Sequence, residues 1–429
     1  MSDEPVVETA SGKVRGRDLG QVSAFTGIPY AAAPVGERRL APPVPHEGWA
    51  GVRAAEVPGP AVPQNASRLE AVMGPRTPDW NEDGCLNLNV WAPAGARDLP
   101  VLVWFHGGGF SSGSGGWDWY DGARLAELGG IVVVTANYRL GPLGYLHLPE
   151  LGADNLGLRD QAAVLHWVHE NIAAFGGDPG QLTVGGQSAG AHSSLLLAIE
   201  ERTRPLISRV ILQSSPLALS PMGPELAAER ARRYLEILGT DAAGLRGQPV
   251  TKLLEAAAEL AAETARPGEV APALYPVLGG FGASRALPDA LAEDPLAGLD
   301  VLVGTVKDEL TAFGIREPDV AAVGLGSAGV DVLAEHRAGR SYVYRFDRVP
   351  EPDPGELGAT HCAELPFLFG TFDAYPDAAM LGPVTEADHA LHKELARAFA
   401  EFVATGRAPW PEPVRHFGQP MVAVSITKR

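Results

Sequence analysis

Cysteine, positive charge and long apolar runs are all scarce in this sequence of 429 residues. Its two cysteines, Cys85 and Cys362, exclude a disulfide framework and a four-cysteine zinc site, and they favour two free thiols in a reducing compartment. No apolar run approaches the 18 residues of a membrane helix, and the N-terminus has no secretory signal. The 34 Lys and Arg against 52 Asp and Glu give a net charge of −18. Nucleic acids and anionic membranes need a basic face, so we expect neither as a partner, and we expect a cytoplasmic protein.

The apolar residues that are present predict a mostly parallel sheet. They make up 45% of the chain, an ordinary share for a globular protein. Short continuous apolar runs, separated by helical patterns, are typical of strands covered on both faces. The predicted strands cover 101–105, 131–134, 182–184, 210–212, 301–303 and 342–346.

Three helices outside this alternation can be predicted from composition and spacing. Ala-rich segments at 224–238 and 251–265 form a helical insertion at about 217–275. A later helix over 385–405 has one apolar stripe, with Thr385 as its N-cap and Asp388 three residues on as an imperfect capping box. We expect it to pack on the sheet.

The strongest chemical motif is Gly-x-Ser-x-Gly over 186–190, directly after a strand and before a helix. In a nucleophile elbow, a sharp turn of this kind holds the serine hydroxyl clear of the backbone, and the glycines stand where a Cβ has no room. The motif predicts Ser188 as the nucleophile. The alternative is a glycine-rich turn with an idle serine.

A second motif, His-Gly-Gly-Gly at 106–109, follows the strand 101–105. Consecutive glycines leave backbone N–H groups free to stabilise a developing oxyanion, and the N–H of Ala189 is a further donor. A flexible phosphate-binding loop is the alternative, but no Lys-Ser/Thr follows as a P-loop requires.

A nucleophilic serine needs a base and an orienting acid, in the order serine, acid, histidine in α/β-hydrolases. The histidines downstream are His336, His361, His389, His392 and His416. His361 follows the strand 342–346 on a loop, where a late base belongs, whereas His389 and His392 are expected on a helix surface. His192 is close in sequence to Ser188, but the elbow directs the serine away from the helix that follows. For the acid, Asp308 and Glu309 are equivalent by spacing.

Several ordered motifs resemble the type B carboxylesterase family, which includes the cholinesterases and the bacterial para-nitrobenzyl esterases. The resemblance extends from the segment beginning at Phe25 to the region of Trp410. It is densest in NLGLRDQ at 155–161, WVHENI at 167–172 and FGGDP at 175–179, with further blocks CLNLNV at 85–90 and NYRLG at 137–141.

The resemblance implies an α/β-hydrolase fold with a mostly parallel sheet, helices on both faces and a reduced helical cap, in a single domain over 1–429. It implies a catalytic triad of Ser188, Glu309 and His361. The implied oxyanion donors are Gly108, Gly109 and Ala189. Ser215 resembles a serine behind the family's triad.

Four features depart from the family pattern. Gln187 stands where a glutamate usually precedes the nucleophile, and Val62 stands where a cysteine usually pairs with the one at 85. Gly84 interrupts an acidic block, so that either Glu82 or Asp83 is expected to pair with Arg39. Only 52 positions separate Glu309 from His361, about half the usual interval, which predicts a more open pocket.

These residues predict a serine carboxylesterase that hydrolyses carboxylic esters through an acyl-enzyme, without metal or cofactor. The residues expected to line the substrate pocket are Phe110, Trp117, Trp119, Gln187 and Phe313, with loop packing as the alternative for the two tryptophans. A hydrolase of amides, carbamates or lactones has the same triad, and a non-catalytic binding protein of this fold is the third hypothesis. The expected partner is a small-molecule ester, and the sequence is compatible with a monomer.

Overall fold

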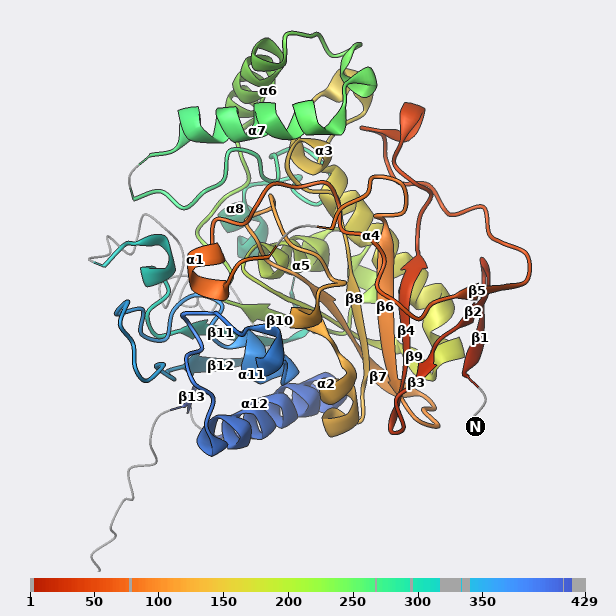
Figure 1. Ribbon diagram of the computed structural model, residues 1–429, viewed down its shortest axis with the longest axis vertical. Coiled ribbons are helices and arrows are strands. Elements are labelled where there is room, and N and C mark those ends of the chain that lie inside the picture. The colour runs from red at the N-terminus through yellow and green to blue at the C-terminus, as the bar shows by residue number, and fades with distance from the viewer. Residues whose placement is uncertain are drawn as a thin grey trace, which may run out of the picture.

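The computed structural model describes residues 4–76, 79–266, 268–293, 296–316, 333, 340–411 and 413–418. Within these residues, ten strands form one sheet in the order β13-β12-β11-β10-β9-β7-β8-β6-β4-β3 (Figure 1). The strands from β13 to β8 are parallel, and β6, β4 and β3 continue the sheet in antiparallel pairs. The predicted mostly parallel sheet is confirmed.

The strands of this sheet are β3 (Arg17–Asp18), β4 (Val22–Pro29), β6 (Asn87–Pro93), β7 (Leu99–Phe105), β8 (Val132–Ala136), β9 (Gly177–Gln187), β10 (Arg209–Gln213), β11 (Asp300–Val306), β12 (Ser341–Phe346) and β13 (Val414–Phe417). A small separate sheet contains β1 (Val6–Thr9), β2 (Gly12–Arg15) and β5 (Val52–Ala54). The α-helices are α1 (Glu70–Met73), α2 (Ala123–Gly129), α3 (Gly141–Tyr145), α4 (Leu156–Asn171), α5 (Ala189–Ile199), α6 (Pro224–Leu238), α7 (Val250–Thr264), α8 (Leu287–Ala292), α11 (Leu365–Phe369) and α12 (Glu386–Thr405).

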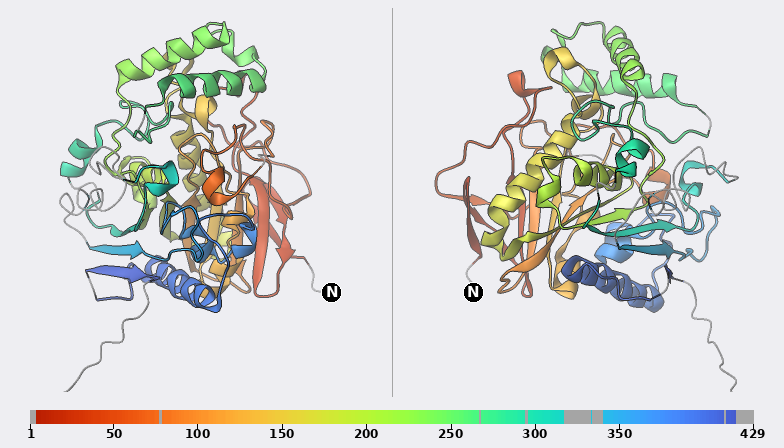
Figure 2. Two further views of the ribbon diagram at one scale, coloured as in Figure 1. Left: turned by 60° about the vertical axis from the view of Figure 1, so that its left-hand side comes forward. Right: turned by 180° about the vertical axis from the view of Figure 1, so that it is seen from behind.

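The central strands are apolar throughout because both faces of the sheet are covered. On β7, Val101, Val103 and Phe105 belong to one buried cluster, together with side chains of α4 and α5. Leu102 and Trp104 point to the other face and pack with side chains of α2, α11 and α12. Successive side chains of a strand alternate between faces, so a strand buried on both reads as a continuous apolar run. The two helical layers are visible on either side of the sheet in Figure 2.

Helices α6 and α7 stand apart from the sheet, at the top of Figure 1, where they pack against each other and α7 packs against α3. Their bounds match, to within one residue, the two helices predicted from the alanine-rich segments. A third apolar cluster, which includes Tyr145, Tyr234 and Leu253, joins these helices to the body of the molecule.

Helix α12 has the predicted cap. The Thr385 hydroxyl accepts from the backbone N–H of Asp388, and the Asp388 carboxylate accepts from the backbone N–H of Thr385. Leu395, Phe399 and Phe402 are buried, and Gly406 ends the helix in a left-handed conformation. In the described part of the chain, no helix is both long enough and apolar enough to cross a membrane.

Candidate active site

The predicted nucleophile lies at the turn between β9 and α5. Ser188 has a φ of 56° and a ψ of −121°, a strained conformation for a residue with a side chain. Its backbone N–H donates to the carbonyl of Gln213 at 2.8 Å, which fixes the turn against the end of β10. Both chain neighbours of Ser188 are buried, but Ser188 itself is half-exposed and lines a cavity. This is the geometry of a nucleophile elbow.

The glycines on either side of Ser188 allow the elbow to press against the end of β7. A Cβ on Gly186 or on Gly190 would overlap the carbonyl oxygen of Phe105. Close packing therefore explains why both positions are glycine, as predicted.

The glycine loop after β7 lies beside this elbow. Gly108 and Gly109 have φ values of 108° and 60°, which suit residues without a Cβ. The side-chain amide of Gln64 both donates to the carbonyl and accepts from the N–H of Gly113, at 2.8 and 2.7 Å, and so holds the far end of the loop. Such a brace reduces the reorganisation that a flexible glycine loop would need during reaction.

The backbone amides predicted to bind an oxyanion are collected around one cavity. Gly108, Gly109 and Ala189 all line the same cavity as Ser188. In the described part of the chain, no protein group accepts a hydrogen bond from any of these three N–H groups. Ala189 is also the first residue of α5, where backbone N–H groups have no partner within the helix.

His361 and Glu309 form a buried pair. The Nδ1 of His361 lies 2.6 Å from Oε2 of Glu309, and the other carboxylate oxygen accepts from the N–H of Val306 at 3.0 Å. His361 is 0% exposed and Glu309 is 4% exposed. A carboxylate at this distance keeps the proton on Nδ1 and leaves Nε2 as an acceptor.

The structure distinguishes the two carboxylates that spacing could not. Asp308 accepts instead from the N–H of Ala359 at 2.9 Å, and its backbone pairs with that of Thr360. Asp308 therefore anchors the loop that carries His361, whereas Glu309 contacts the imidazole itself.

The acceptor nitrogen of His361 faces the elbow. Its Nε2 lies 3.1 Å from the side-chain nitrogen of Gln187, the residue before Ser188. The amide donates and the imidazole accepts. Gln187, predicted as a pocket residue, is thus a buried partner of the histidine and does not line the cavity.

The other candidate histidines lie elsewhere. His192 is buried on α5, where burial lowers its pKa to about 4. His389 is exposed on α12, and His416 pairs with Asp347 at 2.6 Å. The prediction that His392 lies on the surface is wrong, because its Nδ1 bonds the carbonyl of Phe367 at 2.7 Å beneath α11. His336 lies outside the described residues.

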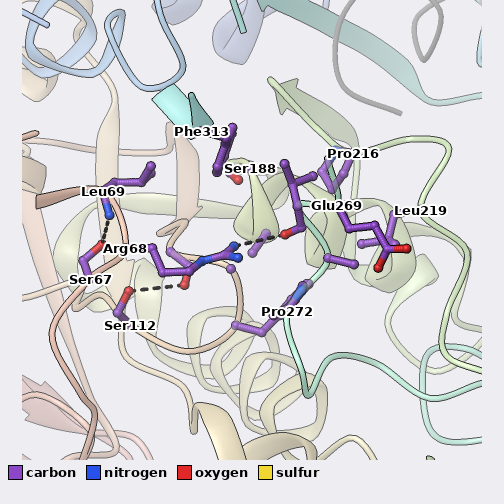
Figure 3. Close-up of a pocket in the computed structure, with 16 residues that line it drawn as sticks. Ser67, Arg68, Leu69, Ser112, Ser188, Pro216, Leu219, Glu269, Pro272 and Phe313 are labelled. Carbon is purple, nitrogen blue, oxygen red and sulfur yellow. Dashed lines mark hydrogen bonds between the residues drawn. The ribbon is translucent and has the colours of Figure 1, made fainter. Parts of the chain in front are cut away.

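The cavity has a volume of about 240 Å³ and is mainly apolar. Phe110 and Phe313 line it as predicted, and the ring of Phe313 lies 5.4 Å from that of His361. Figure 3 shows the labelled residues, which include Arg68, Pro216, Leu219 and Pro272. Sequence reasoning missed these four, because they come from loops that carry no motif.

Trp117 and Trp119 lie away from this cavity. Trp119 stacks on Tyr375 at 5.3 Å and donates to the carbonyl of Ala374, and the guanidinium of Arg76 lies over the ring of Trp117. Both tryptophans belong to the apolar cluster on the α12 face of the sheet. The two tryptophans therefore serve in loop packing, which was the alternative prediction for them.

Close to the Glu309–His361 pair lies a further buried carboxyl group that the sequence did not single out. Glu364 accepts from the hydroxyl of Ser214 at 3.2 Å. Burial, and then the charge of Glu309, raise the pKa of Glu364 to about 8. Ser215, the serine that the resemblance suggested, has a buried hydroxyl with no partner among the described residues.

The structure also tests the predictions for Arg39 and for the two cysteines. Arg39 pairs with Glu82 through both carboxylate oxygens, each at 2.5 Å. Cys85 and Cys362 are both free and buried. The predicted opening of the pocket by the short interval before His361 falls partly outside the described residues.

Comparison with known sequences gives a consistent result over most of the chain. Residues 3–324 match the sequence model of the carboxylesterase family. A relative described as probable N-octanoylanthranilate hydrolase AqdA2, from Rhodococcus erythropolis, is 39% identical, and the match covers 94% of each chain. The para-nitrobenzyl esterase of Bacillus subtilis is 35% identical over 94% of this chain and 90% of its own.

Solved structures agree with this comparison. A thermophilic PNB esterase superimposes with a TM-score of 0.86 at 34% identity, covering 96% of this chain and 92% of the other. A Geobacillus stearothermophilus carboxylesterase gives a TM-score of 0.80 at 34% identity, covering 95% and 92%. The fold is therefore shared with these proteins.

Proposed function

The chain belongs to the carboxylesterase family and is a serine carboxylesterase of the α/β-hydrolase fold, and from this premise we propose the residues that perform its chemistry. Ser188 is the nucleophile, His361 is the general base and Glu309 orients the base, all within a single domain. The observation that carries the proposal is the buried Glu309–His361 pair, whose free Nε2 faces the residue next to Ser188.

Acylation begins when the Ser188 hydroxyl attacks the ester carbonyl carbon. Nε2 of His361 takes the hydroxyl proton, and Glu309 stabilises the imidazolium that forms. In the resting structure this nitrogen accepts from Gln187, so the serine hydroxyl must displace that amide before the proton can move. The imidazolium then protonates the departing alcohol, and the acyl group stays on Ser188.

The negative oxygen of the tetrahedral intermediate is bound by the N–H groups of Gly108, Gly109 and Ala189. These donors line the cavity and have no protein acceptor among the described residues. Donors that are fixed before reaction stabilise charge without a cost of reorganisation, and each is worth about 10²- to 10³-fold in rate.

Deacylation repeats the same attack and proton transfers, with water in place of the serine hydroxyl. His361 removes a proton from the water that attacks the acyl carbon, and later returns it to the Ser188 oxygen. A carboxylic acid is released, and the enzyme is restored.

Amide hydrolysis is the second candidate. One relative is described as a probable N-octanoylanthranilate hydrolase, and that name denotes an N-acyl compound. The same serine, base and oxyanion donors serve esters and amides, and pocket shape decides between them.

The test is turnover of p-nitrophenyl butyrate, the matching anilide and a lactone by the wild type and Ser188→Ala. We expect hydrolysis of the ester that disappears in the variant, at unchanged thermal stability. Equal ester hydrolysis by the two proteins would refute Ser188 as nucleophile, and faster anilide turnover would favour the second candidate.

We further propose that the protein works in the cytoplasm. The two buried free cysteines support this setting. Cell fractionation of the source organism tests it.

A further inference from the structure

A cationic side chain, that of Arg68, lies at the cavity of the proposed active site. Arg68 lines it together with Ser188 and the glycine loop. A Cβ built on Gly109 would lie 3.0 Å from Nη2 of Arg68, so that the guanidinium is adjacent to a proposed oxyanion donor. In Figure 3 the Arg68 side chain extends into the middle of the cavity, toward the side on which Ser188 and Pro216 lie.

This guanidinium has no carboxylate partner among the described residues. Its hydrogen bond goes to the backbone carbonyl of Val270, at 3.1 Å. Glu269 also lines the cavity, but its carboxylate points away from Arg68 in Figure 3. Arg68 as a whole residue is exposed to solvent. Protein atoms nevertheless surround its guanidinium, and this burial lowers the pKa of the group.

Arg230 and Arg266 of the cap donate to backbone carbonyls, but several other arginines there and nearby have carboxylate partners. Arg233 bonds Glu263, Arg39 bonds Glu82 and Arg159 bonds Asp154. In a chain of net charge −18, an arginine in a cavity that meets only a backbone carbonyl has N–H donors left for another group.

We propose that Arg68 binds a carboxylate carried by the substrate, so that the preferred substrates are esters with an anionic group close to the scissile bond. The inference rests on the proposed function, because it concerns the same cavity. Arginine recognises a carboxylate through two parallel N–H···O bonds.

There is room beyond Arg68 for the rest of such a substrate. A neighbouring cavity of about 350 Å³ shares Arg68, Glu269, Ala271 and Pro272 with the first, so the two adjoin at the arginine. The alanine-rich face of α7, with Ala257, Ala258 and Ala261, forms one wall of this second cavity.

The test compares two matched pairs of esters. Mono-(4-nitrophenyl) glutarate against 4-nitrophenyl butyrate places the anion in the acyl half, and 3-carboxyphenyl butyrate against phenyl butyrate places it in the alcohol half. For each pair, the ratio of kcat/KM for the anionic ester to that for the neutral ester is measured in the wild type, Arg68→Met and Arg68→Lys.

We expect this ratio to fall about 10- to 100-fold in Arg68→Met for at least one pair, as loss of a charged hydrogen bond predicts. Arg68→Lys retains the positive charge but lacks the two parallel N–H donors, so the ratio of kcat/KM values should fall less in this variant. Arg232→Met, which removes an exposed cation from α6, is the control and should leave the ratio unchanged.

An unchanged ratio in both pairs for Arg68→Met overturns the inference. So does an equal loss on anionic and neutral esters accompanied by a lower Tm, because Arg68 would then only tie its loop to Val270. Failure of the wild type to hydrolyse any of the four esters would instead count against the proposed function, and against this inference with it.

Discussion

Asp308 and Glu309 are neighbours in the sequence with different partners in the structure. Glu309 bonds the imidazole of His361, and Asp308 bonds the backbone of the same loop. We predict that Glu309→Gln lowers kcat by about 10³- to 10⁴-fold, because an amide neither fixes the tautomer nor stabilises the imidazolium.

Asp308→Asn is the matched control, since it keeps the side-chain oxygen that accepts from Ala359. We expect a loss of less than about tenfold, measured as kcat on p-nitrophenyl butyrate. A larger loss in Asp308→Asn than in Glu309→Gln would show that the acid has been assigned to the wrong carboxylate.

Glu364 gives a prediction for stability against pH. Its ordinary pKa of 4.5 rises to about 8 in the folded protein through burial. The folded state therefore holds a proton that the unfolded state has lost. The contribution of Glu364 to stability therefore falls as pH rises from 4.5 to about 8, by an amount on the order of a few kcal/mol, and is level above that range.

Glu364→Gln removes this titration. The difference in free energy of unfolding, variant minus wild type, should therefore increase from pH 4.5 to 8 in urea titrations. Glu401→Gln, on the exposed side of α12, serves as the control and should give a constant difference. A constant difference for Glu364→Gln as well would contradict the raised pKa.

Between β9 and α5, the elbow is an element whose shape depends on close packing. The turn presses against Phe105 at the end of β7, and both its glycines are needed for that contact. We predict that Gly190→Ala lowers kcat by about 10²-fold or more, because the Cβ pushes Ser188 and the oxyanion loop apart.

Gly247→Ala is the control, because a Cβ there meets nothing within 4 Å. Far-ultraviolet circular dichroism and kcat are measured on all three proteins. Normal turnover in a folded Gly190→Ala variant would refute the packing account of the elbow.

Elements with regular patterns were predictable from the sequence. The six predicted strands are all present, because strands buried on both faces read as apolar runs. Helix α12 could be placed by the Thr385 cap and its apolar stripe. The choice between Asp308 and Glu309 could not be made from spacing, because it depends on which carboxylate the loop at His361 approaches.

Across the whole molecule, parallel topology brings the chemistry to one place. Ser188 follows β9, the glycine loop follows β7 and Glu309 follows β11, and parallel strands end at the same edge of the sheet. That convergence follows from the predicted strand pattern. The residues of the cavity wall cannot be predicted from the strand pattern, because Arg68 and Pro272 come from loops whose positions depend on tertiary packing.

The same dependence explains the errors in placing Trp117, Trp119 and His392. Trp117 and Trp119 follow the glycine loop closely in the sequence, and this proximity led to the prediction that they line the pocket. Packing against Tyr375 and Arg76, distant in sequence, places them elsewhere. His392 lies on the half of α12 that α11 covers, a contact that helical periodicity alone does not reveal.

The most direct test of the account is covalent labelling of the nucleophile. The enzyme is treated with diethyl 4-nitrophenyl phosphate, whose phosphorus accepts the serine oxygen as 4-nitrophenol leaves, and its peptides are then mapped by mass spectrometry. We predict one diethylphosphoryl group per chain, on Ser188, with loss of ester hydrolysis in proportion to labelling. A fully labelled residue other than Ser188, or complete inactivation without modification of Ser188, would contradict the account.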